Sequence, residues 1–188
     1  TICVPSGNFG NITAGLFAQR MGLPIMNFIA ANNANDIFYN YLLSGIYSPK
    51  ASIQTIANAM DVGDPSNFAR ILDLYKSSHA EICNHISGAT YSDDEIAATM
   101  KKCYEQTGYV LDPHGACGYQ ALKDNLKEGE TGVFLETAHP AKFKEKVDAI
   151  LSTYLEIPPR LADFMKGKKQ SLEMAADFSA FKQFLLSV

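Results

Sequence analysis

The sequence predicts an α/β protein built on a parallel sheet, and three observations carry this prediction. Ile2-Cys3-Val4 and residues 25–31 are short apolar runs of the kind that form buried strands. Between them, residues 12–22 carry apolar side chains at helical spacing, which completes a strand–helix–strand unit. Further along, residues 131–136 again have the pattern of a strand, and residues 143–155 that of an amphipathic helix.

The composition is that of an ordinary globular protein. Of 188 residues, 47% are hydrophobic and 19% are charged, and the formal net charge is −4. This length suits one domain with a substantial core, and the acidic balance argues against a nucleic-acid partner. No apolar run is long enough to span a bilayer, so no membrane partner is expected. The four cysteines are scattered and form no CxxC pair, which is typical of reduced thiols in the cytoplasm.

The turn between the first strand and the first helix has the chemistry of an anion site. It consists of Ser6, Gly7, Asn8, Phe9, Gly10 and Asn11. A strand, a glycine-bearing turn and a helix direct free backbone N–H groups and the positive end of the helix dipole at one spot. We expect Gly7 and Gly10 to adopt positive φ, and Ser6, Asn8 and Asn11 to add side-chain donors. The alternative is an ordinary tight turn with Asn11 as the helix N-cap.

Two further polar positions follow predicted strands. Residues 32–36 (Asn-Asn-Ala-Asn-Asp) come after the second strand, and Thr137 comes directly after the strand at 131–136. Because loops at the carboxyl ends of parallel strands line the ligand crevice of an open α/β sheet, both fall on the same rim as the glycine turn. The roles of Asn33 and Asp36 stay open, since Asn and Asp also serve in ordinary turns and caps.

A third strand-to-helix turn is predicted at residues 110–118. It contains Asp112 and His114, and small residues occupy the first turn of the helix that follows. Small residues let a flat ligand or another backbone approach closely. His114 is either an acid–base group or, as is more usual for a turn histidine, a cap for its neighbours.

The pattern of residues 66–108 predicts a compact helical insertion. Apolar residues recur at helical spacing in its first half, and Ser92-Asp93-Asp94-Glu95 is a capping box that begins another helix. His79, Cys83 and His85 resemble metal ligands in their spacing, but no second cluster completes a site. We therefore predict no metal.

The end of the chain differs in character from the rest. Past Pro158-Pro159 it is charged, and an apolar stripe predicts a last helix that packs on the body. We expect residues 1–155 to form a partial α/β domain and residues 156–188 to form a tail. The chain begins at Thr1 and enters a strand at once, so we expect it to be a fragment of something longer.

Three stretches, taken together and in this order, resemble the C-terminal half of the threonine synthase family, which are pyridoxal-phosphate (PLP) enzymes of fold type II. They are VPSGNFGNITAGLFAQRMGLPI, NAMDVGDPSNF and ETAHPAKF. The resemblance extends from Ile2 to about Leu155 and weakens in the tail. It implies a three-layer αβα fold with a mainly parallel sheet, a helical insertion and C-terminal helices. It also implies conversion of O-phospho-L-homoserine and water to L-threonine and phosphate.

The resemblance also assigns residues. It implies that the phosphate of PLP is held by Ser6, Gly7, Asn8, Phe9, Gly10 and Asn11. It implies that the hydroxyl of Thr137 bonds the pyridine nitrogen and leaves that nitrogen largely unprotonated. The Schiff-base lysine of the family lies upstream of the glycine turn, and no lysine here has that context. We therefore assign no catalytic residue, and we expect the chain by itself to be inactive and to need the missing N-terminal half.

Two positions depart from the family pattern. Asp112 stands where relatives usually have Glu, and Glu136 stands where many have a small residue, so their roles stay open. Two alternatives to threonine synthase also remain. The first is a fragment of another fold type II PLP lyase or synthase. The second is a non-catalytic α/β module that binds an anion or uses the turn only for its structure.

Overall fold

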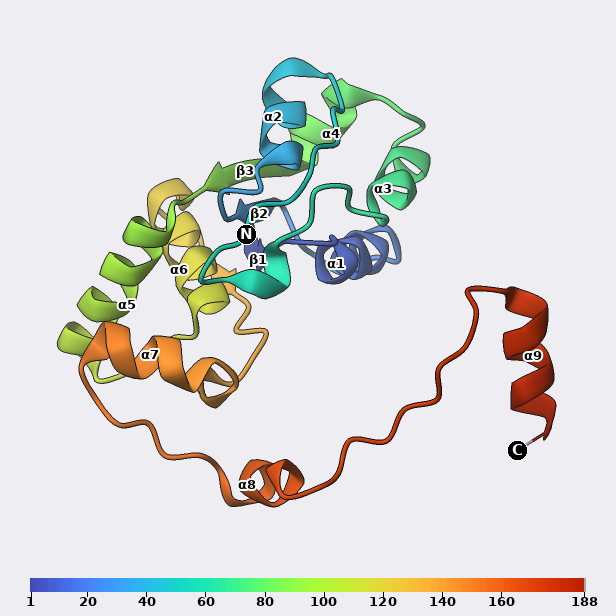
Figure 1. Cartoon of the computed structure of the whole chain (residues 1–188). Coiled ribbons are helices and arrows are strands. Elements are labelled where there is room, and N and C mark those ends of the chain that lie inside the picture. Colours follow the sequence, from blue (N-terminus) through green and yellow to red (C-terminus); the bar gives the residue numbers. More distant parts are fainter. Residues whose placement is uncertain (188) are drawn as a thin grey trace. The chain divides into compact units, whose positions relative to one another are not determined.

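The computed structural model describes residues 1–187 (Figure 1). In chain order the elements are β1 (Ile2–Pro5), α1 (Gly10–Arg20), β2 (Phe28–Asn32), α2 (Ile37–Ser44), η1 (Asn58–Met60), α3 (Phe68–Leu74), α4 (His79–His85), β3 (Ile86–Thr90), α5 (Asp93–Thr107), α6 (Pro113–Asn125), β4 (Val133–Phe134), η2 (Pro140–Phe143), α7 (Lys144–Leu151), α8 (Pro159–Met165) and α9 (Phe178–Ser187). They fall into two compact units, Thr1–Leu155 and Glu156–Val188.

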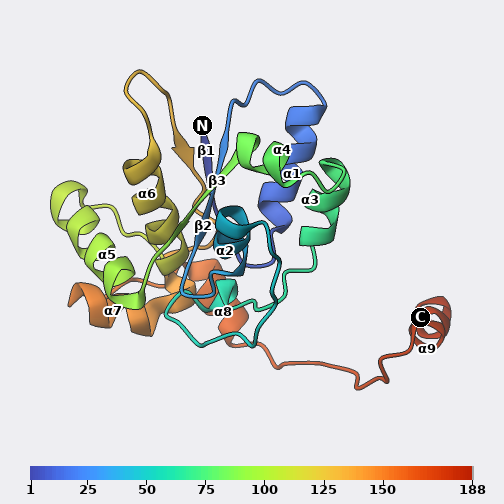
Figure 2. The ribbon, with the colours of Figure 1, turned by 90° about the horizontal axis from the view of Figure 1, so that it is seen from above.

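The first unit is built on one parallel sheet with the strand order β3-β2-β1-β4. Pro5 of β1 pairs with Ala31 of β2, and Cys3 of β1 pairs with Phe134 of β4. Helices cover both faces, with α5 and α6 on one side and α1, α3 and α4 on the other (Figure 2). The predicted three-layer αβα fold with a parallel sheet is therefore confirmed.

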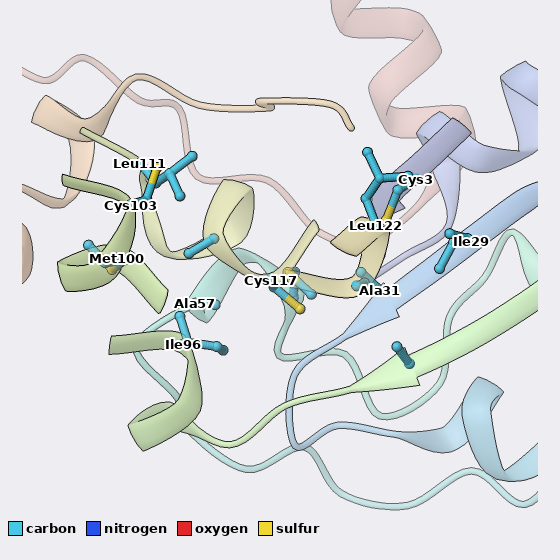
Figure 3. Packing of buried hydrophobic residues seen from close by; sticks show 14 of the residues in the cluster. Cys3, Ile29, Ala31, Ala57, Ile96, Met100, Cys103, Leu111, Cys117 and Leu122 are labelled. Carbon is cyan, nitrogen blue, oxygen red and sulfur yellow. The ribbon is translucent and has the colours of Figure 1, made fainter. Parts of the chain in front are cut away.

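The sheet and α5, α6 and α7 enclose one hydrophobic cluster. Figure 3 shows Cys117 and Leu122 of α6 between the strands and α5, which contributes Met100 and Cys103. Every residue of β2 is buried, as expected for an inner parallel strand covered on both faces. Burial of this kind contributes about 1.5–3 kcal/mol for each large apolar side chain.

A second cluster lies on the opposite face of the sheet, under α1 and α2. Ile12 and Leu16 of α1 pack there with Phe28 of β2 and Phe38 of α2. At Gly15 of α1 an added Cβ would lie 2.7 Å from the Phe28 ring, so glycine is required for this close helix–strand contact. The helix that follows the glycine turn is thereby held firmly against the sheet.

Residues 66–108 differ from the predicted helical insertion, because they include a strand of the sheet. They contain α3, α4 and α5, but also β3, which pairs with β2 along its whole length. Lys76 and Ser77, with φ of 51° and 57°, divide the expected long helix into α3 and α4. The sequence hides β3 because this edge strand is short and contains only one large apolar side chain, Ile86.

Two other predicted elements can be compared directly. The capping box at the start of α5 is present: the Ser92 N–H donates to Glu95 Oε2 at 2.8 Å, and the Glu95 N–H donates to Ser92 Oγ at 3.4 Å. The strand expected at 131–136 is much shorter, since only Val133 and Phe134 pair with β1. Thr137 therefore lies in irregular chain beyond the end of β4.

The second unit contains α8 and α9. The predicted last helix is present as α9, and Phe178, Phe181 and Leu185 on it are exposed. Its packing on the body stays a prediction. None of the helices within residues 1–187 has the length and apolar character needed to cross a membrane.

Candidate functional site

The turn from β1 to α1 presents an open helix N-terminus at the carboxyl edge of the sheet. Ser6 extends the strand pairing, because its N–H donates to the Ala31 carbonyl at 2.8 Å. Its hydroxyl donates to the Val4 carbonyl, also at 2.8 Å. The residue at the N-cap is Phe9, not Asn11, and it supplies no side-chain hydrogen bond. The first-turn N–H groups of α1 are therefore available to an anion.

The backbone of the turn differs from the prediction in one respect. The positive φ occurs at Phe9, with a value of 62°, and not at Gly7 or Gly10. The cost of this conformation is about 1–2 kcal/mol, and burial of the ring against Phe38, 4.6 Å between centroids, offsets it. Gly7 is required for a different reason, since a Cβ there would lie 2.7 Å from Met60 Cα. At Gly10 the nearest atom would be 3.8 Å away, so this side of the turn is open.

Asn8 fixes the turn to the segment before α3. Its Oδ1 accepts hydrogen bonds from the Ser66 N–H at 2.7 Å and the Ser66 hydroxyl at 3.1 Å. Asn67 Nδ2 donates to the Asn8 carbonyl at 2.8 Å and is itself oriented by Arg70. The Nδ2 group of Asn8 is the part of this side chain left to donate to a ligand. Asn11 is exposed on the first turn of α1.

Thr137 comes to the same edge of the sheet from the neighbouring strand. The Leu135 N–H donates to the Cys3 carbonyl at 3.0 Å, which continues the pairing of β4 with β1. Thr137 follows and is exposed. A ligand with an anionic group at the N-terminus of α1 and a hydrogen-bonding atom near Thr137 suits this arrangement.

Asp112 and His114 are buried near this edge, and the half-buried Glu136 forms a polar cluster with them. Asp112 is the N-cap of α6, and its Oδ1 accepts from the His114 N–H at 2.8 Å and from His114 Nδ1 at 2.6 Å. His114 Nε2 accepts from the Ala59 N–H at 3.1 Å, so the ring proton is on Nδ1. Glu136 Oε1 accepts from the Asp112 N–H at 3.0 Å. His114 therefore acts as a buried connection between segments and does not face solvent.

The two carboxyl groups of this cluster are shifted in opposite directions. Burial raises the pKa of Glu136 from its usual 4.5 to about 8, and the hydrogen bond to Asp112 and the charge of Asp112 add to this. Burial also raises the pKa of Asp112, but hydrogen bonds from His114 and Glu136 outweigh it, so the pKa is lowered. At neutral pH, Asp112 is therefore the ionised member and Glu136 the protonated one.

The polar turn after β2 is occupied by internal hydrogen bonds. Asn33 Nδ2 donates to Asp61 Oδ1 at 2.8 Å, and Asn35 Nδ2 donates to the same oxygen at 3.1 Å. Asp36 is paired with Lys50 at 2.7 Å. Asn33 therefore fixes the segment that contains Asp61 over the sheet edge. The sequence did not reveal Asp61 as the centre of this network, because its partners come from a distant turn.

The three side chains with metal-like spacing have other contacts. His79 Nε2 lies 3.0 Å from the Tyr41 carbonyl and 3.3 Å from Cys83 Sγ, while His85 Nδ1 lies 2.9 Å from the Glu81 carbonyl. Within residues 1–187 there is no group of three or more His, Cys, Asp or Glu side chains that could hold a metal ion. The contacts of His79 link α4 to the end of α2, and the contact of His85 lies within the last turn of α4.

These features define a class of protein: an α/β protein with a parallel sheet and an uncapped helix N-terminus behind a glycine turn at the carboxyl edge of its strands. Comparison with family models gives a narrower answer. The model described as pyridoxal-phosphate dependent enzyme matches residues 1–137, and the model described as threonine synthase, C-terminal, matches residues 115–185. The chain belongs to the pyridoxal-phosphate dependent enzyme family.

Curated relatives point in the same direction. The threonine synthase of Haemophilus influenzae is 47% identical over 185 residues, which are 98% of this chain and 43% of the relative. That of Escherichia coli is 43% identical over 186 residues, or 99% of this chain and 43% of the relative. The resemblance to the C-terminal part of threonine synthases is thus confirmed, and the chain spans 43% of the length of these relatives.

Solved structures agree with the fold. The crystal structure of threonine synthase from Escherichia coli has a TM-score of 0.83 and 42% identity, covering 99% of this chain and 43% of that one. PLP-bound threonine synthase from Brucella melitensis has a TM-score of 0.84 and 33% identity, covering 98% and 45%. Both are threonine synthases, one of them with PLP bound, and their likeness to nearly the whole chain confirms the predicted fold type II.

Proposed function

We propose that this chain is the part of a PLP-dependent threonine synthase that holds the cofactor phosphate. The whole protein would convert O-phospho-L-homoserine and water to L-threonine and phosphate. Identity of 42% to 47% with bacterial threonine synthases over at least 98% of the chain supports this assignment. The structural observation that carries it is the uncapped N-terminus of α1 directly behind the glycine turn.

The residues present fit a phosphorylated cofactor. In our proposal the backbone N–H groups at Gly10 and Asn11, together with Asn8 Nδ2, donate to the phosphate. Ser6 and Phe9 shape the turn, because both donors of Ser6 are already bonded and the ring of Phe9 is buried. Gly7 provides the close contact with the segment beneath the turn.

At the other end of the cofactor, the Thr137 hydroxyl would bond the pyridine nitrogen. Bound PLP supplies an electron sink for the carbanions that form next to the substrate amino group. A hydroxyl is neutral, so it orients the ring without stabilising a proton on its nitrogen, as a carboxylate would. Thr137 would in this way limit how strongly electrons are withdrawn.

Proton transfer is assigned to the part of the protein upstream of this chain. We place the Schiff-base lysine there, so the upstream part is the partner that completes the site. By itself the chain is expected to hold only half of the cofactor site and to be inactive. We further propose that the protein works in the cytoplasm on a small-molecule substrate.

The test uses the full-length protein. Its absorbance with PLP measures cofactor binding, and assays for threonine and phosphate follow the addition of O-phospho-L-homoserine. We expect bound cofactor and release of both products in equal amounts. Bound cofactor without turnover would favour another fold type II lyase or synthase. Protein that binds no cofactor would favour the non-catalytic anion-binding module.

A further inference from the structure

The carboxyl groups of Asp112 and Glu136 are neighbours, and one oxygen of each is buried without a partner. Within residues 1–187, Asp112 Oδ2 and Glu136 Oε2 are among the few buried side-chain nitrogen and oxygen atoms that have no hydrogen-bond partner. Their other oxygens are occupied, Asp112 Oδ1 by His114 and Glu136 Oε1 by the Asp112 N–H. The two remaining oxygens therefore lack a partner although the two carboxyl groups are neighbours. A carboxylate can only accept a hydrogen bond, so these two oxygens satisfy each other only if one of the carboxyl groups carries a proton.

The surroundings decide which carboxyl carries the proton. Asp112 is fully buried but receives two hydrogen bonds from His114, and both favour its ionised form. The carboxyl of Glu136 lies directly on Gly115, where an added Cβ would overlap it. The titratable groups near it are Asp112, His114 and Tyr109, and no ion pair of the described chain includes Glu136. The proton is therefore held by Glu136.

This carboxyl pair belongs to a continuous connection across the sheet edge. The connection begins at Glu136, directly before Thr137, and passes through Asp112 and His114 to the Ala59 N–H. Ala59 and its neighbour Met60 lie against Gly7, since a Cβ at Gly7 would come within 2.9 Å of the Ala59 carbonyl. Backbone segments at both ends of the site are thus joined by buried groups.

We propose that Asp112 and Glu136 share one proton and, through His114, act as a positioning unit that keeps Thr137 and the phosphate turn at a fixed separation. The inference about separation rests on the proposed cofactor site, whereas the shared proton does not. Loss of the proton puts a second negative charge beside Asp112 in a buried place. Repulsion then moves Glu136 away from α6, and Thr137 moves with it.

The direction of the pH dependence follows from this arrangement. The folded protein holds the proton of Glu136 up to a pH of about 8, while the unfolded chain loses it near 4.5. Between these values the folded state binds more protons than the unfolded state, so the free energy of unfolding falls as the pH rises. Glu136→Gln cannot ionise, and its amide can still donate to Asp112, so this contribution disappears in the variant.

The first experiment needs no cofactor. Urea midpoints of the full-length protein are measured from pH 4.5 to 8.5 for the wild type, Glu136→Gln and Glu95→Gln. Glu95 is the matched control, because it is an exposed carboxylate in the capping box of α5. We expect the midpoint of Glu136→Gln to fall less with pH than that of the wild type and of Glu95→Gln. If the urea midpoints of all three proteins change with pH in parallel, the proposal of a shared proton is wrong.

A second measurement needs no variant, so it still tests the shared proton if Glu136→Gln does not fold. The infrared carbonyl stretch of a protonated carboxylic acid is sought in the wild type at pH 7 and followed up to pH 9. We expect a carboxylic-acid band that disappears near pH 8, and a spectrum without it at pH 7 would contradict the proposal. This observation depends neither on a substitution nor on PLP.

The positioning role is tested by the affinity for PLP. Between pH 6.5 and pH 9 we expect the wild type to lose about tenfold more affinity than Glu136→Gln, equivalent to one hydrogen bond to a charged group. Equal losses would leave the shared proton intact but remove its role in positioning. If neither the wild type nor the variant binds PLP at any pH, the proposed cofactor site is wrong. The urea and infrared results still show whether Asp112 and Glu136 share a proton.

Discussion

Two glycines of the turn between β1 and α1 are needed for different reasons, although the sequence makes them look alike. Gly7 lies against backbone atoms of Met60 and Ala59, and backbone cannot rotate out of the way as a side chain can. Gly10 begins α1, and a Cβ added there would lie 3.8 Å from its nearest neighbour. The first glycine therefore serves the packing of the turn, and the second leaves room on its outer side.

This difference predicts opposite results for two alanine variants. Gly7→Ala forces η1 away from the turn and should lower the free energy of unfolding by about 1–3 kcal/mol. In Gly10→Ala the new Cβ would lie no closer than 3.8 Å to any neighbour, so the variant should be neutral or should stabilise the helix by a few tenths of a kcal/mol, up to about 1 kcal/mol. Urea unfolding of both variants beside the wild type measures this. Equal stabilities would contradict the close contact at Gly7.

Thr137 allows a sharper test of function. Thr137→Val keeps the shape of the side chain and removes the hydroxyl, so in the full-length protein turnover should fall about tenfold, as for the loss of one hydrogen bond. Because Thr137 is exposed, the urea midpoint should change little. Wild-type turnover in a normally folded variant would remove Thr137 from the ring-nitrogen role. Thr131→Val, an exposed threonine before β4, is the matched control.

Among the elements, α5 shows most directly how local sequence sets structure. Ser92 and Glu95 satisfy each other's groups at its N-terminus, and the three acidic residues of its first turn favour the positive end of the helix dipole. At its other end Gly108 adopts φ of 72°, as a C-cap glycine does. Both boundaries follow from short-range chemistry and were predictable.

Removing the cap should therefore have a measurable cost. Ser92→Ala should lower the free energy of unfolding by about 1 kcal/mol, and Ser52→Ala, an exposed serine in irregular chain, should not. Hydrogen bonds from Ser92 lower the pKa of Glu95, so the stability from this pair is present above pH 4.5 and lost as the pH falls below it. Urea unfolding should show that Ser92→Ala lowers the free energy of unfolding less at pH 3 than at pH 7. The same loss at both pH values would exclude the charged capping box.

The elements that sequence reasoning missed depend on distant partners. β1, α1 and β2 have apolar runs or clear periodicity, so their order already indicated a parallel sheet. By contrast, β3 is a strand only because the edge of β2 is available to it. The polar cluster of Asp112, His114 and Glu136 likewise joins Glu136 to a turn that is distant in the sequence. Their burial, and the pKa of Glu136, could not be read from spacing.

The chain as a whole divides into units of different character. Residues 1–155 contain both hydrophobic clusters, whereas α8 and α9 contain no buried residue. The stretch between these two helices is irregular and exposed. Local opening is easiest where few apolar groups are buried and backbone is exposed, so cleavage by a protease should begin in such a segment.

We therefore predict that trypsin first cuts this chain after Lys168 or Lys169, which are exposed and outside any helix. The product that contains residues 1–155 should persist much longer, because most of its backbone is paired in the sheet and helices. Mass spectrometry of samples taken over time identifies each cut. The double variant Lys168→Gln, Lys169→Gln should delay the first cleavage, while Lys123→Gln, on α6, should not. First cuts within residues 1–155 would mean that the larger unit opens as readily as the segment between α8 and α9.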